Sequence, residues 1–177
     1  KDDAEAMAYI NRRPNVMYTR DISIMAGTGI ILLNLALKGR KFDEWVVQRA
    51  AARLGIPVLG RIEPPGILEG GGLQFFDEHT LLAGLCDRAN ESAIHQLRDI
   101  LFTQTPVDRL IMIMMPEGAI HIDGQFLMID EKLAIAQKSS LQVYPSILFE
   151  KGRPTRPIWF TDFLEQNNIG FASAPGS

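Results

Sequence analysis

The sequence predicts an α/β protein built from a repeated unit. Short apolar runs are typical of buried strands, stretches with apolar residues at helical spacing are typical of surface helices, and Gly or Pro stands at many of their ends. The order strand, strand, helix and strand recurs three times, with about 50 residues in each unit, a period that is typical of propellers and other arrays. Three such units would not close a ring.

The first unit is predicted from its apolar runs and its helical spacing. A buried strand is expected over residues 29–37, a helix over residues 42–54 and a second strand over residues 58–62. Gly55 and Pro57 follow the helix, and both residue types are usual signals for the end of a helix.

The second unit shows the same order. Strands are expected over residues 73–76 and 80–85, joined at a polar turn, and a strand over residues 110–114 closes the unit. Asn90 is expected to cap a helix that runs to about residue 102, because apolar residues recur on one face of this stretch.

The third unit is predicted from strands over residues 126–129 and 132–135, an extended segment over residues 141–149 and a helix over residues 157–166.

The ends of the chain carry less information than its middle. Residues 4–10 read like the end of a helix, so residues 1–170 are expected to form a single domain that is incomplete at both ends. Residues 171–177 are mostly small or polar and are expected to be a tail or linker.

The composition excludes several classes of function. The chain has 177 residues, of which 46% are hydrophobic and 22% charged, as in ordinary globular domains. Its net charge of −3 argues against bulk binding to nucleic acid or to an anionic membrane, and no apolar run approaches the roughly 18 residues of a transmembrane helix. The single cysteine excludes an internal disulfide framework and fits the cytoplasm.

No Cys/His cluster has the spacing of a structural zinc site, so neither a metal nor a cofactor is expected. A homo-oligomer is compatible with the sequence.

His121 and Asp123 are the first candidate site residues. Residues two apart on an extended strand point to the same face, so both side chains could address one pocket. Histidine titrates near neutrality, and a neighbouring carboxylate can fix its tautomer, which suits proton transfer. A solvated turn is the alternative interpretation.

Three other segments contain candidate residues. Asp21 follows Arg20 at the end of a polar stretch and is a candidate ligand-binding carboxylate. The alternative interpretation is a surface salt bridge between these two residues. Glu69 precedes three glycines, which permit close approach of a ligand to the backbone but are equally expected in a tight turn. Arg88 follows a strand and could bind a ligand carboxylate, or pair with Asp87. Cys86 is more simply a small buried hydrophobe than a nucleophile.

Taken together, three motifs resemble the guanidine-modifying superfamily, and most closely the arginine deiminases and their amidinotransferase and dimethylargininase relatives. Pro14-Asn15-Val16-Met17-Tyr18-Thr19-Arg20-Asp21 resembles the family's Pro-Asn-x-x-Phe-Thr-Arg-Asp. Glu69-Gly70-Gly71-Gly72 resembles Glu-Gly-Gly-Asp, and His121-Ile122-Asp123 resembles His-Leu-Asp. The motifs occur in the family's order and are together fairly specific.

The resemblance implies a fold and a chemistry. The family fold is the pentein, an α/β propeller of five strand-strand-helix-strand units around a central active site, so about three of the five units would be present. The family chemistry is covalent: a cysteine thiolate attacks the guanidinium carbon, an amine leaves, and water releases a ureido product. The expected partner is therefore a small guanidino substrate such as arginine.

The resemblance also implies roles for individual residues. Asp21 and Asp123 would hold the guanidinium, Glu69 would orient His121, and His121 would shuttle protons. Asn15 and Tyr18 would line the pocket. Arg88 would bind the α-carboxylate of the substrate, and Arg40 is a weaker candidate for the same role.

The sequence departs from the family pattern at two points. The family nucleophile lies in a Gly-rich segment of the last unit, and Cys86 stands in a different motif, so the 177 residues alone are expected to be inactive. Gly72 stands where the family usually has an aspartate that contributes to substrate binding. The alternatives are a non-catalytic guanidino-binding pseudoenzyme and an amidinotransferase, which would use the same residues.

Overall fold

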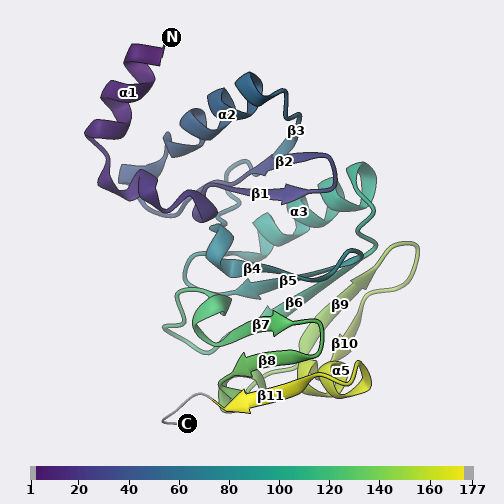
Figure 1. Cartoon of the computed structure of the whole chain (residues 1–177). Coiled ribbons are helices and arrows are strands. Elements are labelled where there is room, and N and C mark those ends of the chain that lie inside the picture. Colours follow the sequence, from purple (N-terminus) through teal and green to yellow (C-terminus); the bar gives the residue numbers. More distant parts are fainter. Residues whose placement is uncertain (1–2, 174–177) are drawn as a thin grey trace.

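Three β-sheets follow one another along the chain in the computed structural model, which describes residues 3–173. In Figure 1 they lie one below another, from the purple N-terminal part to the yellow C-terminal part. Each sheet contains an antiparallel hairpin and a later strand that runs parallel to the hairpin's second strand, with a helix between them. The α/β class and the threefold recurrence of strand, strand, helix and strand are therefore confirmed.

The first sheet has the order β1-β2-β3. Its elements are β1 (Ser23–Ala26), β2 (Gly29–Leu32), α2 (Asp43–Leu54) and β3 (Val58–Arg61). The predicted strand 29–37 is too long, because the chain beyond β2 makes other hydrogen bonds. The carbonyl of Asn34 accepts from the backbone N–H of Leu68, and the backbone N–H of Ala36 donates to the carboxylate of Glu69. Helix α2 ends at Gly55, whose φ of 70° is the left-handed conformation that glycine adopts readily.

The second sheet is the widest and has the order β10-β9-β6-β5-β4. Its own unit comprises β4 (Leu73–Asp77), β5 (Thr80–Leu85), α3 (Glu91–Gln104) and β6 (Arg109–Met114). The predicted cap is confirmed, because the Asn90 side chain accepts a hydrogen bond of 3.0 Å from the backbone N–H of Ala93.

The third sheet has the order β11-β8-β7 and differs most from its prediction. Its unit comprises β7 (Phe126–Asp130), β8 (Leu133–Ala136), α5 (Phe160–Gln166) and β11 (Gly170–Ser173). Strand β11 pairs in parallel with β8, so residues 171–173 belong to the sheet and not to a tail; residues 174–177 lie outside the described part.

An insertion separates β8 from α5. It comprises α4 (Lys138–Leu141), β9 (Ser146–Glu150) and β10 (Arg156–Ile158). Strand β9 pairs with β6 and β10 pairs with β9, so the insertion widens the second sheet. The prediction of an extended segment over 141–149 is therefore only partly right, and the helix predicted from residue 157 begins at Phe160, after β10.

The second sheet lies between two hydrophobic cores. Successive side chains of β6 alternate between them, as the two faces of a strand require: Leu110 and Met112 pack in the core with α3, whereas Ile111 and Ile113 pack in the core with α5 and β7. Within the described residues, no helix combines the length and the apolar character needed to cross a membrane.

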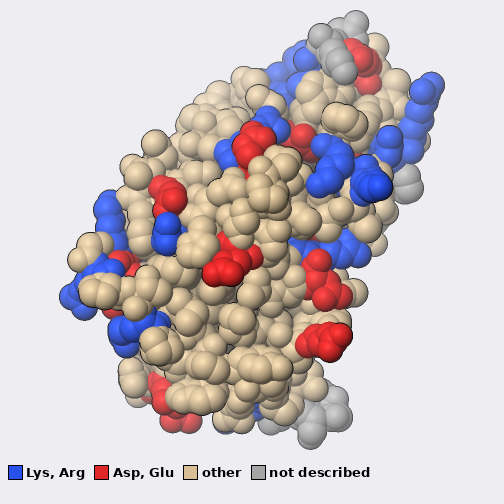
Figure 2. All heavy atoms as spheres, turned by 180° about the vertical axis from the view of Figure 1, so that it is seen from behind, with Lys and Arg blue, Asp and Glu red and all other residues tan. Residues whose placement is uncertain are grey.

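Helix α1 (Asp3–Asn11) packs on α2 through polar and aromatic contacts. Asp3 forms ion pairs with Arg49 and Arg53, and the Tyr9 ring meets the Trp45 ring edge-on with centroids 5.9 Å apart. Other charged side chains are dispersed: on the face shown in Figure 2, Lys and Arg are interspersed with Asp and Glu.

Short 3-10 turns precede all three hairpins and contact one another. They are η2 (Thr19–Asp21), η4 (Gly70–Gly72) and η5 (Ile122–Gly124), with η4 touching both others. A Cβ on Gly70 would overlap the carbonyl oxygen of Arg20, and one on Gly71 would overlap the ring of His121. The glycines therefore allow the three turns to meet.

This packing predicts unequal effects of alanine at two neighbouring glycines. Gly70→Ala forces η2 and η4 apart and should lower the free energy of unfolding by about 1–3 kcal/mol. Gly72→Ala is the matched control, because its Cβ would find its nearest neighbour at 3.7 Å, an ordinary contact. Its effect should stay below about 1 kcal/mol. Urea unfolding measures both, and equal losses would contradict the proposed packing.

Candidate active site

Turns η2 and η5, together with Glu69 immediately before η4, line one cavity, which we call the site cavity. It has a volume of about 690 Å³ and lies where η2, η4 and η5 meet. All eight predicted site residues line it: Asn15, Tyr18, Asp21, Arg40, Glu69, Arg88, His121 and Asp123. Sequence reasoning missed five further lining residues, which are Met17, Thr19, Arg20, Leu37 and Ile120. Four of them directly adjoin predicted ones in the chain, and that proximity is the signal that could have found them.

Glu69 is the most buried ionisable group in this cavity, with 2% of its surface exposed. Its backbone N–H donates to the carbonyl of Arg88, which fixes it just ahead of η4. Its Oε1 accepts a 3.0 Å hydrogen bond from the backbone N–H of Ala36 and a 3.4 Å contact from Arg88, while Oε2 faces His121. Burial opposes ionisation, but the bonds from His121 and Ala36 and the charge of Arg88 outweigh it and lower the pKa of Glu69.

His121 lies immediately before η5, with its ring against Gly71. Its Nε2 is 3.2 Å from Oε2 of Glu69, so an N–H there donates to the carboxylate. This hydrogen bond raises the pKa of His121; burial opposes the rise, and the nearby carboxylates of Asp21 and Asp123 add to it. Glu69, rather than the sequence neighbour Asp123, is therefore the carboxylate that hydrogen-bonds this histidine.

Asp123 occupies the outer part of the cavity. Its side chain is 32% exposed, and its nearest charged partner is Arg20 at 3.9 Å. Arg20 in turn donates to the carbonyl of Leu73, at the start of β4. Asp123 is thus a carboxylate that remains open to solvent and to a ligand.

Asp21 lies deeper and is held by Arg40. The Nη1 of Arg40 donates to Oδ2 of Asp21 at 2.7 Å, while its Nε donates to Asp43 at 2.9 Å. Its Nη2 donates to the carbonyls of Asn15 and Tyr18 at 3.2 and 3.3 Å. Arg40 is only 5% exposed, so it is a buried part of the cavity wall, and its donors are already engaged.

Arg88 and Cys86 lie close in sequence but differ in their position relative to the site cavity. The Arg88 side chain lines the cavity and is 26% exposed. Cys86 is half-buried and does not line the cavity. Burial, and then the charge of Asp87, raise the pKa of the Cys86 thiol, which disfavours the nucleophilic thiolate.

Asp21, Glu69 and His121 form a compact set of donor and acceptor atoms. One such atom from each lies within 4.8 Å of the other two, so the set has room for a small cation. A planar organic cation suits it chemically, because the carboxylates accept N–H bonds and the imidazole can take or give a proton.

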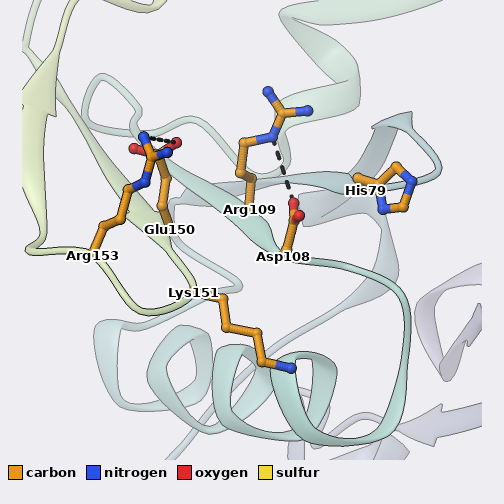
Figure 3. A pocket seen from close by; sticks show the side chains of 6 residues that line it. All are labelled: His79, Asp108, Arg109, Glu150, Lys151 and Arg153. Atoms are coloured by element: carbon orange, nitrogen blue, oxygen red, sulfur yellow. Dashed lines mark ion pairs between the residues drawn. The ribbon is translucent and has the colours of Figure 1, made fainter.

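A second hollow of about 350 Å³ lies elsewhere, around the ends of β6 and β9. Figure 3 shows its six lining side chains, in which Arg109 pairs with Asp108 at 3.7 Å and Arg153 with Glu150 at 3.8 Å. The side chains of Lys151 and Arg109 extend in opposite directions. These groups do not converge on a ligand, so the site cavity is the better candidate.

The Glu69–His121 pair predicts a pH dependence of stability. His121 has a raised pKa, so its contribution is full below its ordinary value of 6.5 and is lost as pH rises through the raised value. Glu69 has a lowered pKa, so its contribution is full above 4.5 and is lost as pH falls through the lowered value. The pair therefore stabilises the fold most between these two ordinary values.

His121→Gln should accordingly cost about 1–2 kcal/mol of unfolding free energy near pH 5.5 and less near pH 9. His79→Gln is the control, because its ring contacts the backbone carbonyl of Pro106 rather than a carboxylate. Urea unfolding at both pH values measures the difference. A His121→Gln cost that does not change with pH would contradict the ion pair.

Known proteins share sequence similarity with most of this chain. The chain is 28% identical over 159 residues to the arginine deiminase of Limosilactobacillus reuteri, covering 85% of this chain and 37% of the relative. It is 29% identical over 169 residues to that of Oenococcus oeni, covering 91% of this chain and 39% of the relative. The chain thus spans well under half the length of these relatives.

Solved structures share the fold at low sequence identity. A dimethylarginine dimethylaminohydrolase bound to S-methyl-L-thiocitrulline matches with a TM-score of 0.70 and 16% identity, over 98% of this chain and 67% of that one. The cyanobacterial arginine dihydrolase ArgZ matches with a TM-score of 0.68 and 14% identity, over 92% of this chain and 23% of that one. A family model described as arginine deiminase matches residues 1–158. The chain therefore belongs to the arginine deiminase family, within the superfamily that its three motifs indicated.

Proposed function

We propose that this chain provides the acid–base and guanidinium-binding half of an amidine hydrolase that acts on arginine or a related guanidino compound. The observation that carries the proposal is the convergence of Asp21, Glu69 and His121 on one cavity, each from the segment ahead of the hairpin of a different sheet. Membership of the arginine deiminase family supports it, and relatives of the same fold are described with citrulline and with L-arginine.

The proposed role of the two aspartates is to hold the substrate guanidinium. Asp21 keeps Oδ1 without a hydrogen-bond partner among the described residues, so this oxygen is available to a ligand N–H. Asp123 offers a second, partly exposed carboxylate across the cavity. Charge-assisted hydrogen bonds of this kind are stronger than neutral ones and fix the plane of the guanidinium. Asn15 and Tyr18 complete the lining, and Arg88 is placed to meet a substrate carboxylate.

The proposed role of His121 is proton transfer. A thiolate of the whole protein would attack the guanidinium carbon, and the leaving amine would take a proton from His121. Water would then attack the same carbon and give up two protons, one to His121 and one to the solvent. The carbon–sulfur bond breaks, which releases the ureido product and restores the thiolate. Glu69 would favour the protonated ring before the first step, which agrees with the raised pKa of His121.

We place the nucleophile outside these 177 residues. The sequence has one cysteine, and Cys86 neither lines the site cavity nor has a pKa that favours the thiolate. We further propose that the three units belong to a pentein propeller of five units, because residues in or just before the turn ahead of each hairpin line the shared cavity. The position of Cys86 also favours a second candidate, a non-catalytic module that binds guanidino ligands.

Binding and turnover by the purified chain test this proposal. The 177-residue chain should bind arginine in a calorimeter but release no citrulline from it, because losing a covalent nucleophile costs roughly 10⁶-fold in rate. Absence of binding to both arginine and agmatine would refute the guanidino site. Clear citrulline release would instead place the nucleophile within this chain.

A substitution at Asp21 tests the guanidinium-binding role. Asp21→Asn keeps the side-chain shape but removes the charge, so the affinity for arginine should fall about tenfold or more. Asp108→Asn is the control, since this carboxylate lies in the second hollow. Calorimetry measures both affinities, and a variant that binds as tightly as the parent chain would exclude Asp21 as a ligand contact.

A further inference from the structure

We propose that Arg20 is an exchangeable partner of Asp123: it offsets the charge of this carboxylate while the site cavity is empty, and it turns away when a guanidino ligand binds. Arg20 therefore lowers the affinity of the site for its ligand. This inference rests on the proposed function, because it describes how one of the two guanidinium-holding carboxylates becomes available.

The contact between Arg20 and Asp123 is weak. Nη1 of Arg20 lies 3.9 Å from Oδ2 of Asp123, which is within the range of an ion pair but too far for a hydrogen bond. The two side chains are 53% and 32% exposed, so water screens their attraction. Within residues 3–173, the Asp123 carboxylate has no other ion pair and no hydrogen bond. The empty cavity thus leaves Asp123 with one loose partner.

This pair is the loosest of three in the site cavity. Each carboxylate that lines the cavity has an arginine as its partner. The distances are 2.7 Å from Arg40 to Asp21, 3.4 Å from Arg88 to Glu69 and 3.9 Å from Arg20 to Asp123. The first two pairs each include a side chain that is less than a tenth exposed, whereas both side chains of the third face solvent. A ligand guanidinium can therefore replace Arg20 more readily than either of the other arginines.

Arg20 has anchors that do not depend on Asp123. Its Nη2 donates a 3.0 Å hydrogen bond to the carbonyl of Leu73, at the start of β4. Its own backbone carbonyl lies against Gly70, where an added Cβ would overlap it. Its backbone can therefore stay in place when the guanidinium turns away from Asp123.

A hollow beside the site cavity can receive the guanidinium. Arg20 lines both spaces, and the smaller one, which we call the strand hollow, has a volume of about 270 Å³ and is lined by residues of β1 and β4. Gln74 also lines the strand hollow, and its Oε1 is buried without a hydrogen-bond partner among the described residues. A buried acceptor without a donor is costly, so a guanidinium that turns toward Gln74 would satisfy it.

The charge of the ligand decides between the two positions of Arg20. A ligand guanidinium can approach Asp123 to about 2.8 Å, the usual length of a charge-assisted hydrogen bond, and Arg20 lies farther away. Two guanidinium cations at one carboxylate repel each other. Turning toward Gln74 takes Arg20 out of this repulsion and gives Oε1 a donor. Ligand binding thus costs the site the Arg20–Asp123 pair.

Removing the charge of Arg20 tests the exchange. Arg20→Gln should lower the dissociation constants of arginine and agmatine by the same factor, about threefold, because the ligand no longer replaces an exposed ion pair. Agmatine lacks the carboxylate of arginine, so it separates effects on the guanidinium from effects on the carboxylate. Calorimetric titration of the 177-residue chain measures both constants and the stoichiometry.

Removing the acceptor in the strand hollow should act in the opposite direction. Gln74→Leu takes away Oε1, so Arg20 loses the group toward which it turns, and both dissociation constants should rise about threefold. In the Arg20→Gln background the same substitution should change neither constant, which would tie the two residues to one event. Gln74→Leu alone keeps the test usable if Arg20→Gln does not fold.

Two further variants are controls. Arg20→Lys keeps the positive charge, so its dissociation constants should lie closer to those of the parent chain than to those of Arg20→Gln. Arg153→Gln removes an arginine from a matched pair, because Arg153 is exposed and lies 3.8 Å from Glu150, outside the site cavity. This variant should bind both ligands as the parent chain does.

The outcomes that overturn the inference are distinct. A fall in affinity for both ligands in Arg20→Gln would show that Arg20 supports Asp123 and does not compete for it. A fall for arginine alone would show that Arg20 binds the ligand carboxylate. Unchanged constants in both Arg20→Gln and Gln74→Leu, with or without a lower stoichiometry, would exclude the exchange. Failure of the parent chain to bind either ligand would refute the proposed function itself, and this inference with it.

Discussion

The buried carboxylate of Glu69 is the constraint on which the rest of the site depends. A charge that is 2% exposed is costly unless several donors surround it. Here the donors come from different parts of the chain: Ala36 from the first unit, Arg88 from the second and His121 from the third. Satisfying one carboxylate therefore requires all three units to be in place, and the same contacts bring the histidine into the cavity.

The backbone geometry around Glu69 follows from this demand. The donors reach it only if three turns approach more closely than ordinary side chains allow, and Gly70 and Gly71 supply the space. The carbonyl of Arg20 occupies one such space and the His121 ring the other. The glycines that follow Glu69 in the sequence thus serve contacts between the units. Close packing between the units therefore explains these glycines better than a tight hairpin turn, which is what the run of glycines alone suggests.

Much of the fold and the site could be predicted, for reasons that are local in the sequence. Apolar runs and stop signals located α2, α3 and most strands, and six of the predicted residues that line the cavity stand in the three motifs. What escaped prediction depends on distant contacts. Strand β1 is only partly buried, β10 contains Pro157 at a sheet edge, and β11 is recognisable only by its pairing with β8. The engagement of Arg40 likewise depends on Asp43 and on two backbone carbonyls, which no motif encodes.

The insertion between β8 and α5 has a consequence for how such a chain can change over evolution. Every site turn comes before its hairpin, whereas α4, β9 and β10 enter after the hairpin of the third unit. The added strands join the far edge of the second sheet, beyond β6, and leave the turns at its other side in contact. Segments that follow a hairpin in the chain can therefore be gained or lost without moving a residue of the cavity. In this architecture the outer edge of a sheet can change while the site stays the same.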